Sequence, residues 1–272
     1  MRAILPILII SMIAATTAAN YVTMIEPYPS IVHANQSITL GKVGPGQTFY
    51  ITISANATNS TGALFTRGWN KVVATGLPQG WIAENSSLNS QDLSVKVTTA
   101  PDAQNGTYSF NLTAINLGNY SKLGTVRFSA AINVTPDVFR LGVTPTNIST
   151  GPGQPENIYV TINNTGVSDS PFIISINNLP GWNTTQTVIA LHHTQESFTY
   201  PVYVNEPGVY TAQLNVTSVS SPLVSRRVGV TMAVAASVLN DYKALGQGSV
   251  AFPVIYEPVY AIMSFISSLF NN

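Results

Sequence analysis

The sequence offers few residues that could carry out catalysis. It contains no Cys, and its only His residues are His33 and the adjacent pair His192 and His193. Neighbouring side chains of a strand point to opposite faces, so the pair could not easily share a metal ion, and its position before a strand predicts a solvent-exposed loop. The acidic residues are spread thinly, and Glu196 with Glu206 is no better than any other pair as a glycosidase dyad. We therefore expect no catalytic residues, no bound metal and no cofactor.

The spacing that does predict chemistry is Asn-x-Ser/Thr, the acceptor sequence for N-linked sugars. Half of the 24 Asn residues begin such a sequon, where chance would give about five at a Ser/Thr frequency near one fifth. An Asn- and Thr-rich β protein also forms sequons by accident, but the excess favours heavy N-glycosylation. The candidate acceptors are Asn35, Asn56, Asn59, Asn85, Asn105, Asn111, Asn119, Asn133, Asn147, Asn163, Asn183 and Asn215.

The N-terminus predicts export. Arg2 is followed by an apolar run from Ala3 to Ile13 and then by small residues up to Ala19, which is the organisation of a signal peptide. Cleavage after Ala19 would leave a mature chain that starts at Asn20. The alternative is an uncleaved anchor, although the apolar run is short for a bilayer. The expected location is extracellular, at the cell surface.

The composition supports a folded protein with an uncharged surface. Charged residues make up 8% of the chain and cancel to a net charge of zero, while 45% of the residues are apolar. A chain of this kind can fold but has no basic field that would attract phosphates, so nucleic acid is excluded as a partner. Its surface must be polar through hydroxyl and amide groups. In its low charge, lack of Cys and dense sequons, the composition resembles that of archaeal surface proteins.

The chain contains a duplication. Three landmarks recur in the same order at offsets of 107, 102 and 102 residues, so each copy spans about one hundred residues, the usual size of a single sandwich domain. The landmarks are Gly44–Gln47 with Gly151–Gln154, Leu77–Trp81 with Leu179–Trp182, and Gly106–Tyr108 with Gly208–Tyr210.

The pattern between the landmarks predicts an all-β fold. Phe49, Ile51 and Ile53 alternate with polar residues, and Ile158, Val160 and Ile162 do the same in the second copy, which places one apolar set on an inward face. Six or seven short strands per copy indicate two tandem immunoglobulin-like β-sandwiches; closed barrels explain the landmarks less well. The expected strands are 37–40, 47–55, 70–75, 93–99, 106–116 and 125–134, then 140–143, 156–163, 172–177, 197–204, 208–219 and 225–234. The expected parts are a signal peptide (1–19), the sandwiches (20–135 and 136–235) and a tail (236–272), with a stiff connection at Thr135–Phe139.

Four aromatic residues are expected to have structural roles. Trp81 and Trp182 each follow a Pro/Gly turn at a strand end, so each indole should cap the open end of a core. Tyr108 and Tyr210 open a strand after a Pro/Gly turn, where the hydroxyl can bond back as in a tyrosine corner. A second group of aromatics, Tyr28, Tyr50, Trp69 and Tyr120, could form a sugar-facing patch or simply pack in the core and at its rim.

These landmarks carry a resemblance. A Pro-Gly turn, then Leu-Pro-x-Gly-Trp at Leu77–Trp81, then Pro-x-x-x-x-Gly-x-Tyr at Pro101–Tyr108 resembles the alpha-galactosidase-associated NEW-type module, an immunoglobulin-like sandwich related to the CARDB-type modules of prokaryotic surface proteins. The second copy departs from it by one missing residue in Leu179–Trp182 and a shorter last turn. The resemblance covers about 37–134 and 140–234, and it implies a non-catalytic spacer or interaction domain.

The tail after the second copy is strongly apolar. Val250–Phe270 is long enough to span a membrane, but it contains Pro253, Glu257 and Pro258. On a helical wheel, Pro258 stands in the first turn of an amphipathic helix that could lie in a membrane interface, dock on a partner or on the sandwich, or stay disordered. Its apolar arc holds Val259, Ile262, Met263, Phe265, Ile266, Leu269 and Phe270.

The sequence thus predicts an exported, N-glycosylated, non-catalytic surface protein that acts as a stalk, an adhesion module or an envelope-anchored interaction module. Its expected partners are other envelope proteins or glycans, the membrane through the tail, or further copies of itself. One alternative is a subunit of an extracellular filament, in which residues 20–34 are donated as a strand to a neighbour. Another is a binding accessory of a secreted hydrolase or of a surface redox complex.

Overall fold

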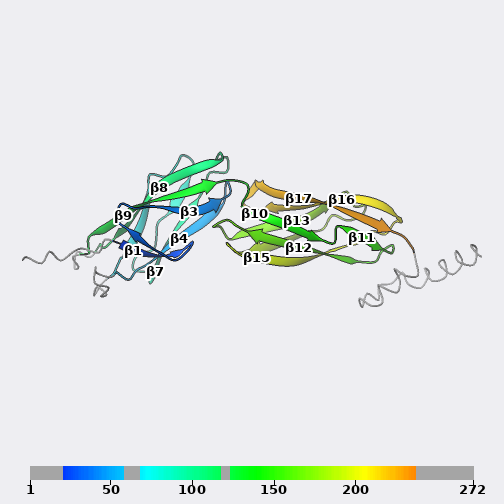
Figure 1. Cartoon of the computed structure of the whole chain (residues 1–272), viewed down its shortest axis with the longest axis horizontal. Helices are drawn as coiled ribbons and strands as arrows, with labels where there is room; N and C mark the ends of the chain where they lie inside the picture. Colours follow the sequence, from blue (N-terminus) through cyan, green and yellow to red (C-terminus); the bar gives the residue numbers. More distant parts are fainter. Residues whose placement is uncertain (1–20, 58–67, 118–122, 237–272) are drawn as a thin grey trace, which may run out of the picture.

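A computed structural model describes residues 21–57, 68–117 and 123–236. All regular elements in these ranges are β-strands, which confirms the all-β prediction. The strands form two sandwiches that lie end to end along the long axis of the molecule (Figure 1). Each sandwich encloses its own hydrophobic core, and the two cores divide close to Val134 and Val138.

The first sandwich packs a five-stranded sheet against a four-stranded sheet. The strand orders are β2-β1-β4-β7-β6 and β3-β9-β8-β5. Neighbouring strands are antiparallel except for β3, which pairs in parallel with β9. The strands are β1 (Tyr21–Glu26), β2 (Ser30–His33), β3 (Ser37–Val43), β4 (Thr48–Ser54), β5 (Lys71–Thr75), β6 (Ile82–Glu84), β7 (Asp92–Thr98), β8 (Gly106–Ile115) and β9 (Thr125–Val134).

The second sandwich packs a three-stranded sheet against a five-stranded sheet. The strand orders are β10-β12-β15 and β11-β17-β16-β13-β14, and here β11 is the strand that pairs in parallel, with β17. The strands are β10 (Phe139–Thr144), β11 (Asn147–Thr150), β12 (Glu156–Asn164), β13 (Ser170–Asn177), β14 (Thr185–Ala190), β15 (Gln195–Val202), β16 (Gly208–Ser218) and β17 (Ser221–Val234).

This topology is immunoglobulin-like in both copies. The first strand divides into two pieces, β1 and β3 or β10 and β11, and the second piece crosses to the opposite sheet to pair in parallel with the last strand. Apolar side chains alternate inward along β4 and β12, as the sequence predicts, and Phe49, Ile51 and Ile158 are fully buried. The copies differ in their fourth strand, because β6 pairs with β7 whereas β14 pairs with β13 in the other sheet.

The structure corrects the strand-donation hypothesis for residues 20–34. β1 pairs with β4 of its own sandwich and forms a hairpin with β2. Val22, Met24 and Val32 point into the first core with at most 1% of each side chain exposed. This segment is therefore part of the folded sandwich and is not a free strand for a neighbour. The strands expected for the two sandwiches do not include β1 and β2 or the short strands β6, β11 and β14.

Candidate functional site

The repeated Gly-Pro-Gly-Gln landmark is a turn closed by its own Gln side chain. In the first copy the Gln47 Oε1 atom accepts a hydrogen bond from the Gly44 backbone N–H at 2.8 Å, and the Gly46 N–H donates to Ala100 O at 3.0 Å. Gly46 has a φ of +72°, a conformation that favours Gly. The Gln side chain is thus required to fix the loop between β3 and β4, at the end of the first sandwich that meets the second.

The second copy repeats this turn bond for bond. The Gln154 Oε1 atom accepts from the Gly151 N–H at 3.1 Å, and the Gly153 N–H donates to Val204 O at 2.8 Å. Gly153 has a φ of +71°. The turn is therefore a property of the sandwich itself, and any further contact of Gln47 is additional to it.

Gln47 makes that further contact across the domain junction. Its Nε2 atom donates to the Ser170 Oγ atom at 2.8 Å and lies 3.4 Å from the Ser218 Oγ atom, both in the second sandwich. The Ser168 hydroxyl donates back across the junction to Thr48 O. Gln47 is 1% exposed and Ser170 is 2% exposed, so these bonds are shielded from water. Buried polar groups of this kind are costly to leave unpaired, which makes the contact specific for one relative orientation.

An apolar contact lies beside these hydrogen bonds. Val167 belongs to the loop between β12 and β13, yet its side chain packs in the core of the first sandwich, and its N–H donates to Lys42 O at 2.9 Å. A Cβ added at Gly41 would lie 2.8 Å from the Val167 Cγ1 atom, and one added at Gly44 would lie 2.5 Å from the Val224 Cγ2 atom. Glycine at both positions therefore lets the sandwiches approach closely.

The connection between the sandwiches is bonded along its length. The Thr135 N–H donates to Val43 O at 2.9 Å, and the Val138 carbonyl accepts from two N–H groups of the second sandwich, those of Thr165 and Gly166. Asp137 forms an ion pair with Arg226 of β17. The linker is thus held to both sandwiches by hydrogen bonds and an ion pair, in keeping with the stiff connection expected from the sequence.

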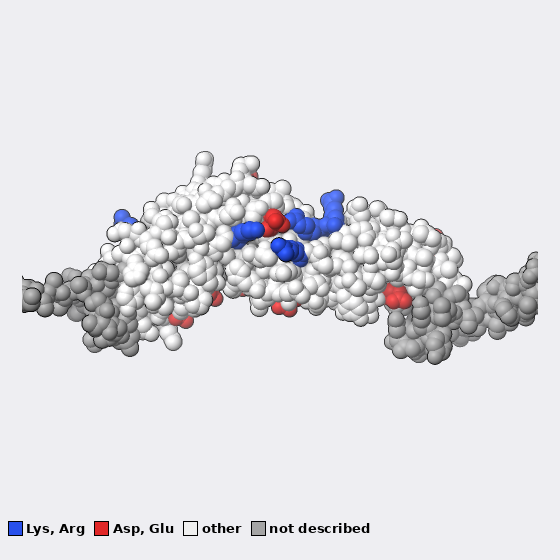
Figure 2. Space-filling model, in the orientation of Figure 1, with Lys and Arg blue, Asp and Glu red and all other residues white. Residues whose placement is uncertain are grey.

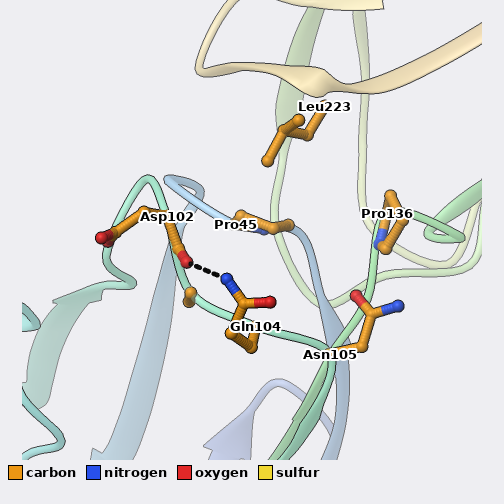
Figure 3. Close-up of a pocket in the computed structure, with 7 residues that line it drawn as sticks. Pro45, Asp102, Gln104, Asn105, Pro136 and Leu223 are labelled. Atoms are coloured by element: carbon orange, nitrogen blue, oxygen red, sulfur yellow. Dashed lines mark hydrogen bonds between the residues drawn. The ribbon is translucent and has the colours of Figure 1, made fainter.

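A cleft of about 550 Å³ opens beside the junction (Figure 3). Leu223 of the second sandwich projects toward the first sandwich and is 57% exposed. The Gln104 Nε2 atom donates to Asp102 O at 3.1 Å and holds the facing loop. The cleft is lined by Pro45, Asp102, Ala103, Gln104, Asn105, Pro136 and Leu223.

Three titratable side chains lie close together in the described structure, those of His192, His193 and Asp169. The His192 Nδ1 atom lies 2.6 Å from the Asp169 Oδ1 atom, and the His193 ring is edge-on to His192 at 5.7 Å. Asp169 also accepts from the His192 N–H at 2.7 Å, so the pair fixes the loop before β15. In the described parts of the chain, no three His, Cys, Asp or Glu side chains are placed to hold a metal ion.

The sequon residues lie on the surface of both sandwiches. Asn59 and Asn119 fall outside the described residues; of the other ten acceptors, seven are exposed, and Asn133, Asn163 and Asn215 are partly exposed. Some amides are already engaged: the Asn85 Oδ1 atom accepts from the Ala74 N–H, and the Asn215 Nδ2 atom lies 3.4 Å from Gln213 O. The exposed acceptors are Asn35, Asn56, Asn85, Asn105, Asn111, Asn147 and Asn183.

The two tyrosines form the bonds of a tyrosine corner. The Tyr108 hydroxyl donates to Gln104 O, and the Tyr210 hydroxyl donates to Glu206 O, each at 3.0 Å. Both bonds span four residues, so the two corners are equivalent despite the shorter turn in the second copy.

The two tryptophans are placed differently. Trp81 is 7% exposed and packs against Tyr108, with ring centroids 5.5 Å apart. Trp182 is only partly buried at the edge of the second core, where Tyr203 meets it edge-on at 4.7 Å. The longer turn of the first copy places Ala103 against the core beside Trp81, and the shorter turn of the second copy leaves its indole less covered.

The proposed sugar-facing aromatics do not form one patch. Trp69 is 2% exposed and belongs to the first core, which is the core-packing alternative given above. Tyr50 is 46% exposed on β4, and Tyr28 is 36% exposed with its hydroxyl bonded to Thr39 O. Tyr120 lies outside the described residues.

The surface is polar mainly through uncharged groups. Figure 2 shows a face with few charged side chains, most of them near the middle of the molecule. Lys96 and Glu84 form an exposed ion pair at 2.8 Å, which raises the pKa of the Lys96 amine through the hydrogen bond to Glu84. Hydroxyl pairs connect neighbouring strands instead: Thr48 with Thr98, Thr52 with Ser94, and Thr161 with Ser197.

The amphipathic helix predicted at Pro258–Asn272, with the apolar arc from Val259 to Phe270, lies outside the described residues. Among the residues that are described, no helix has the length and apolar character needed to cross a bilayer.

No protein-family model matches the sequence, and no curated protein matches it significantly. Among solved structures, a chimeric titin Z1Z2 functionalized with a decorin peptide is similar at 14% identity and a TM-score of 0.34, over 80% of this chain and 99% of that one. The adhesin InvE of Yersinia pseudotuberculosis is similar at 13% identity and a TM-score of 0.26, over 79% of this chain and 60% of that one. Domains 5–6 of the S-layer protein SbsC are similar at 12% identity and a TM-score of 0.25, over 71% and 92%. At these scores the immunoglobulin-like assignment rests on the strand order alone.

Proposed function

We propose that this chain is an exported, N-glycosylated and non-catalytic surface protein whose two sandwiches act as a rigid stalk or adhesion module. The observation that carries the proposal is the junction. Gln47 bonds to Ser170 across it, Val167 inserts into the first core, and the linker between Thr135 and Val138 is bonded at both ends. Such contacts keep the distance between the two ends of a module fixed, which a spacer or adhesion stalk requires.

Two further features support the cell-surface part of the proposal. The residues before Asn20 have the pattern of a signal peptide. Seven sequon Asn residues among those described are exposed, and they occur on both sandwiches, where bulky sugar chains can be attached. The resemblance of the two copies to NEW-type and CARDB-type modules of prokaryotic surface proteins agrees with this role.

The proposal makes the chain a partner of envelope proteins or glycans, with the tail after residue 236 as its attachment. A filament subunit remains the second form of the proposal, by association of whole sandwiches, because the strand at 20–34 is used internally. No contact in the described structure favours the role of a hydrolase or redox accessory.

The test is to express the full chain in a host that exports and N-glycosylates proteins, and to analyse the secreted and envelope fractions by mass spectrometry. The expected product starts near Asn20 and carries glycans on several of the exposed sequons. Small-angle scattering of the purified protein should give one narrow end-to-end distance. An unmodified, cytoplasmic product, or a broad distribution of distances, would contradict the proposal.

A further inference from the structure

Asn105 is the one sequon residue that lines the cleft between the sandwiches among the residues the structure describes. It stands in the loop between β7 and β8, and its side chain is exposed. Thr107, which completes the sequon, is exposed as well. Both groups that a glycosylating enzyme must recognise are therefore accessible.

The cleft has a size and a lining that suit a sugar chain. Its volume of about 550 Å³ lies inside the range of about 300–1,000 Å³ that is typical of small-molecule sites. Pro45, Pro136 and Leu223 provide apolar walls that suit the C–H faces of a sugar ring, and Gln104 provides a polar side chain (Figure 3). Leu223 is 57% exposed without a covering group, so a ring seated there would remove apolar surface from water.

The second copy shows that this sequon belongs to the junction and is not part of the repeated fold. The hydroxyl bonds of Tyr108 to Gln104 and of Tyr210 to Glu206 align the two turns. In that alignment Pro207 stands at the position of Asn105, and Val209 stands at the position of Thr107. The acceptor is present only at the sandwich end that faces another sandwich in this chain.

We infer that an N-linked glycan on Asn105 occupies this cleft and braces the junction, covalently attached to the first sandwich and in contact with Leu223 of the second. The inference rests on the proposed function, since it requires an exported and glycosylated chain. The glycan adds a restraint on the face of the junction that the Gln47 and Val167 contacts leave open.

The experiment compares Asn105→Gln with Asn183→Gln, an exposed sequon in the second sandwich that does not line the cleft. Both proteins are made in the glycosylating host. Glycopeptide mass spectrometry measures the occupancy of each site, and hydrogen exchange measures the opening of the junction amides of Thr135 and Val167. We expect Asn105→Gln to speed exchange at these amides about fivefold, the lower end of coupling between sites, and Asn183→Gln to leave it unchanged.

A second variant tests the contact with the other sandwich. Leu223→Ser should speed junction exchange when the Asn105 glycan is present and have no further effect in the Asn105→Gln background. An unmodified Asn105 in a protein whose other sequons carry glycans would overturn this inference and leave the proposed function standing. Absence of glycans from every sequon would overturn both. If Asn105 carries a glycan in the unsubstituted protein but the junction amides exchange equally fast in Asn105→Gln and Asn183→Gln, the glycan points into solvent. That result would refute the contact between the glycan and the second sandwich.

Discussion

Removing the Gln47 side chain should weaken the junction, and Gln154→Ala is the corresponding change in the second copy. Both side chains close the same Gly-Pro-Gly-Gln turn through their Oε1 atoms. Gln47 additionally donates across the junction to Ser170 at 2.8 Å. Gln47→Ala should therefore remove both the bond that closes its turn and the contact with the second sandwich.

The two contributions can be estimated separately. Leaving the Gly44 or Gly151 N–H without its acceptor should cost about 1–3 kcal/mol of unfolding free energy, and the hydrogen bond to Ser170 should contribute about 1 kcal/mol more. If the sandwiches unfold as one unit, that extra 1 kcal/mol corresponds to about 2–4 °C in melting temperature. The bond between Gln47 and Ser170 should thus account for about 2–4 °C of the fall in melting temperature of Gln47→Ala.

Urea unfolding and calorimetry of the two single variants, of Ser170→Ala and of the Gln47→Ala/Ser170→Ala double variant provide the assay. The double-mutant cycle should give a coupling of about 1 kcal/mol between Gln47 and Ser170. No coupling between Gln47 and Ser170 in the cycle would show that the junction hydrogen bond contributes nothing to stability.

Three other changes test separate parts of the structure. Trp81→Ala should destabilise the first sandwich by about 3–5 kcal/mol and cost more than Trp182→Ala, because Trp81 is buried and Trp182 only partly so; calorimetry showing equal losses would contradict the packing. Burial raises the pKa of the Tyr200 hydroxyl above its ordinary 10.0. The protonated hydroxyl therefore contributes its full stabilisation below about pH 10, and this stabilisation is lost as the pH rises toward the pKa of Tyr200 in the folded protein. Tyr200→Phe should remove part of this alkaline loss while costing about 1 kcal/mol at neutral pH, since the Thr184 carbonyl loses its donor, and identical alkaline unfolding curves would count against it. Deleting residues 249–272 should leave both sandwiches folded, because β17 ends at Val234, and should release the protein from the envelope into the medium; unchanged fractionation would rule out the tail as an anchor.

The sequence predicts the repeated parts of the fold well, because each is encoded by a local pattern. Alternating apolar residues place β4 and β12, and the Pro/Gly turns before Tyr108 and Tyr210 place β8 and β16. The hairpin of β1 and β2 is harder to predict, because its strands are short and β1 finds its partner β4 across a register shift. β6 has only three residues, too few for a periodic pattern to show.

The junction could not be predicted, because its contacts join residues that are distant in sequence. Gln47 and Ser170 are 123 positions apart, and the Gly-Pro-Gly-Gln pattern around Gln47 is the same as that around Gln154, which lies at the other end of the second sandwich. The repeat did give one usable signal: a Gln kept in the same turn of both copies indicates a structural role for its side chain. The partner across the junction has no such signal, since a Ser in a Ser-rich chain is not distinctive.

The duplication explains why one turn can serve two purposes. The Thr135 N–H bonds to Val43 O where the chain leaves the first sandwich, and the Ala235 N–H bonds to Thr150 O where it leaves the second, so both copies present the same backbone at the same end. The side chains and the length of the last turn distinguish the two ends: Asn105 lines the junction cleft, whereas Pro207 stands at the corresponding position of the second copy, where Val209 is 75% exposed. Because the backbone bonds are shared, the orientation of one sandwich on the next depends on side chains at the junction, chiefly Gln47 with Ser170 and the Val167 side chain. Ser170→Ala should therefore alter the angle between the sandwiches without unfolding either one, whereas Gln47→Ala should also affect the fold of the first sandwich, because Gln47 closes the shared turn.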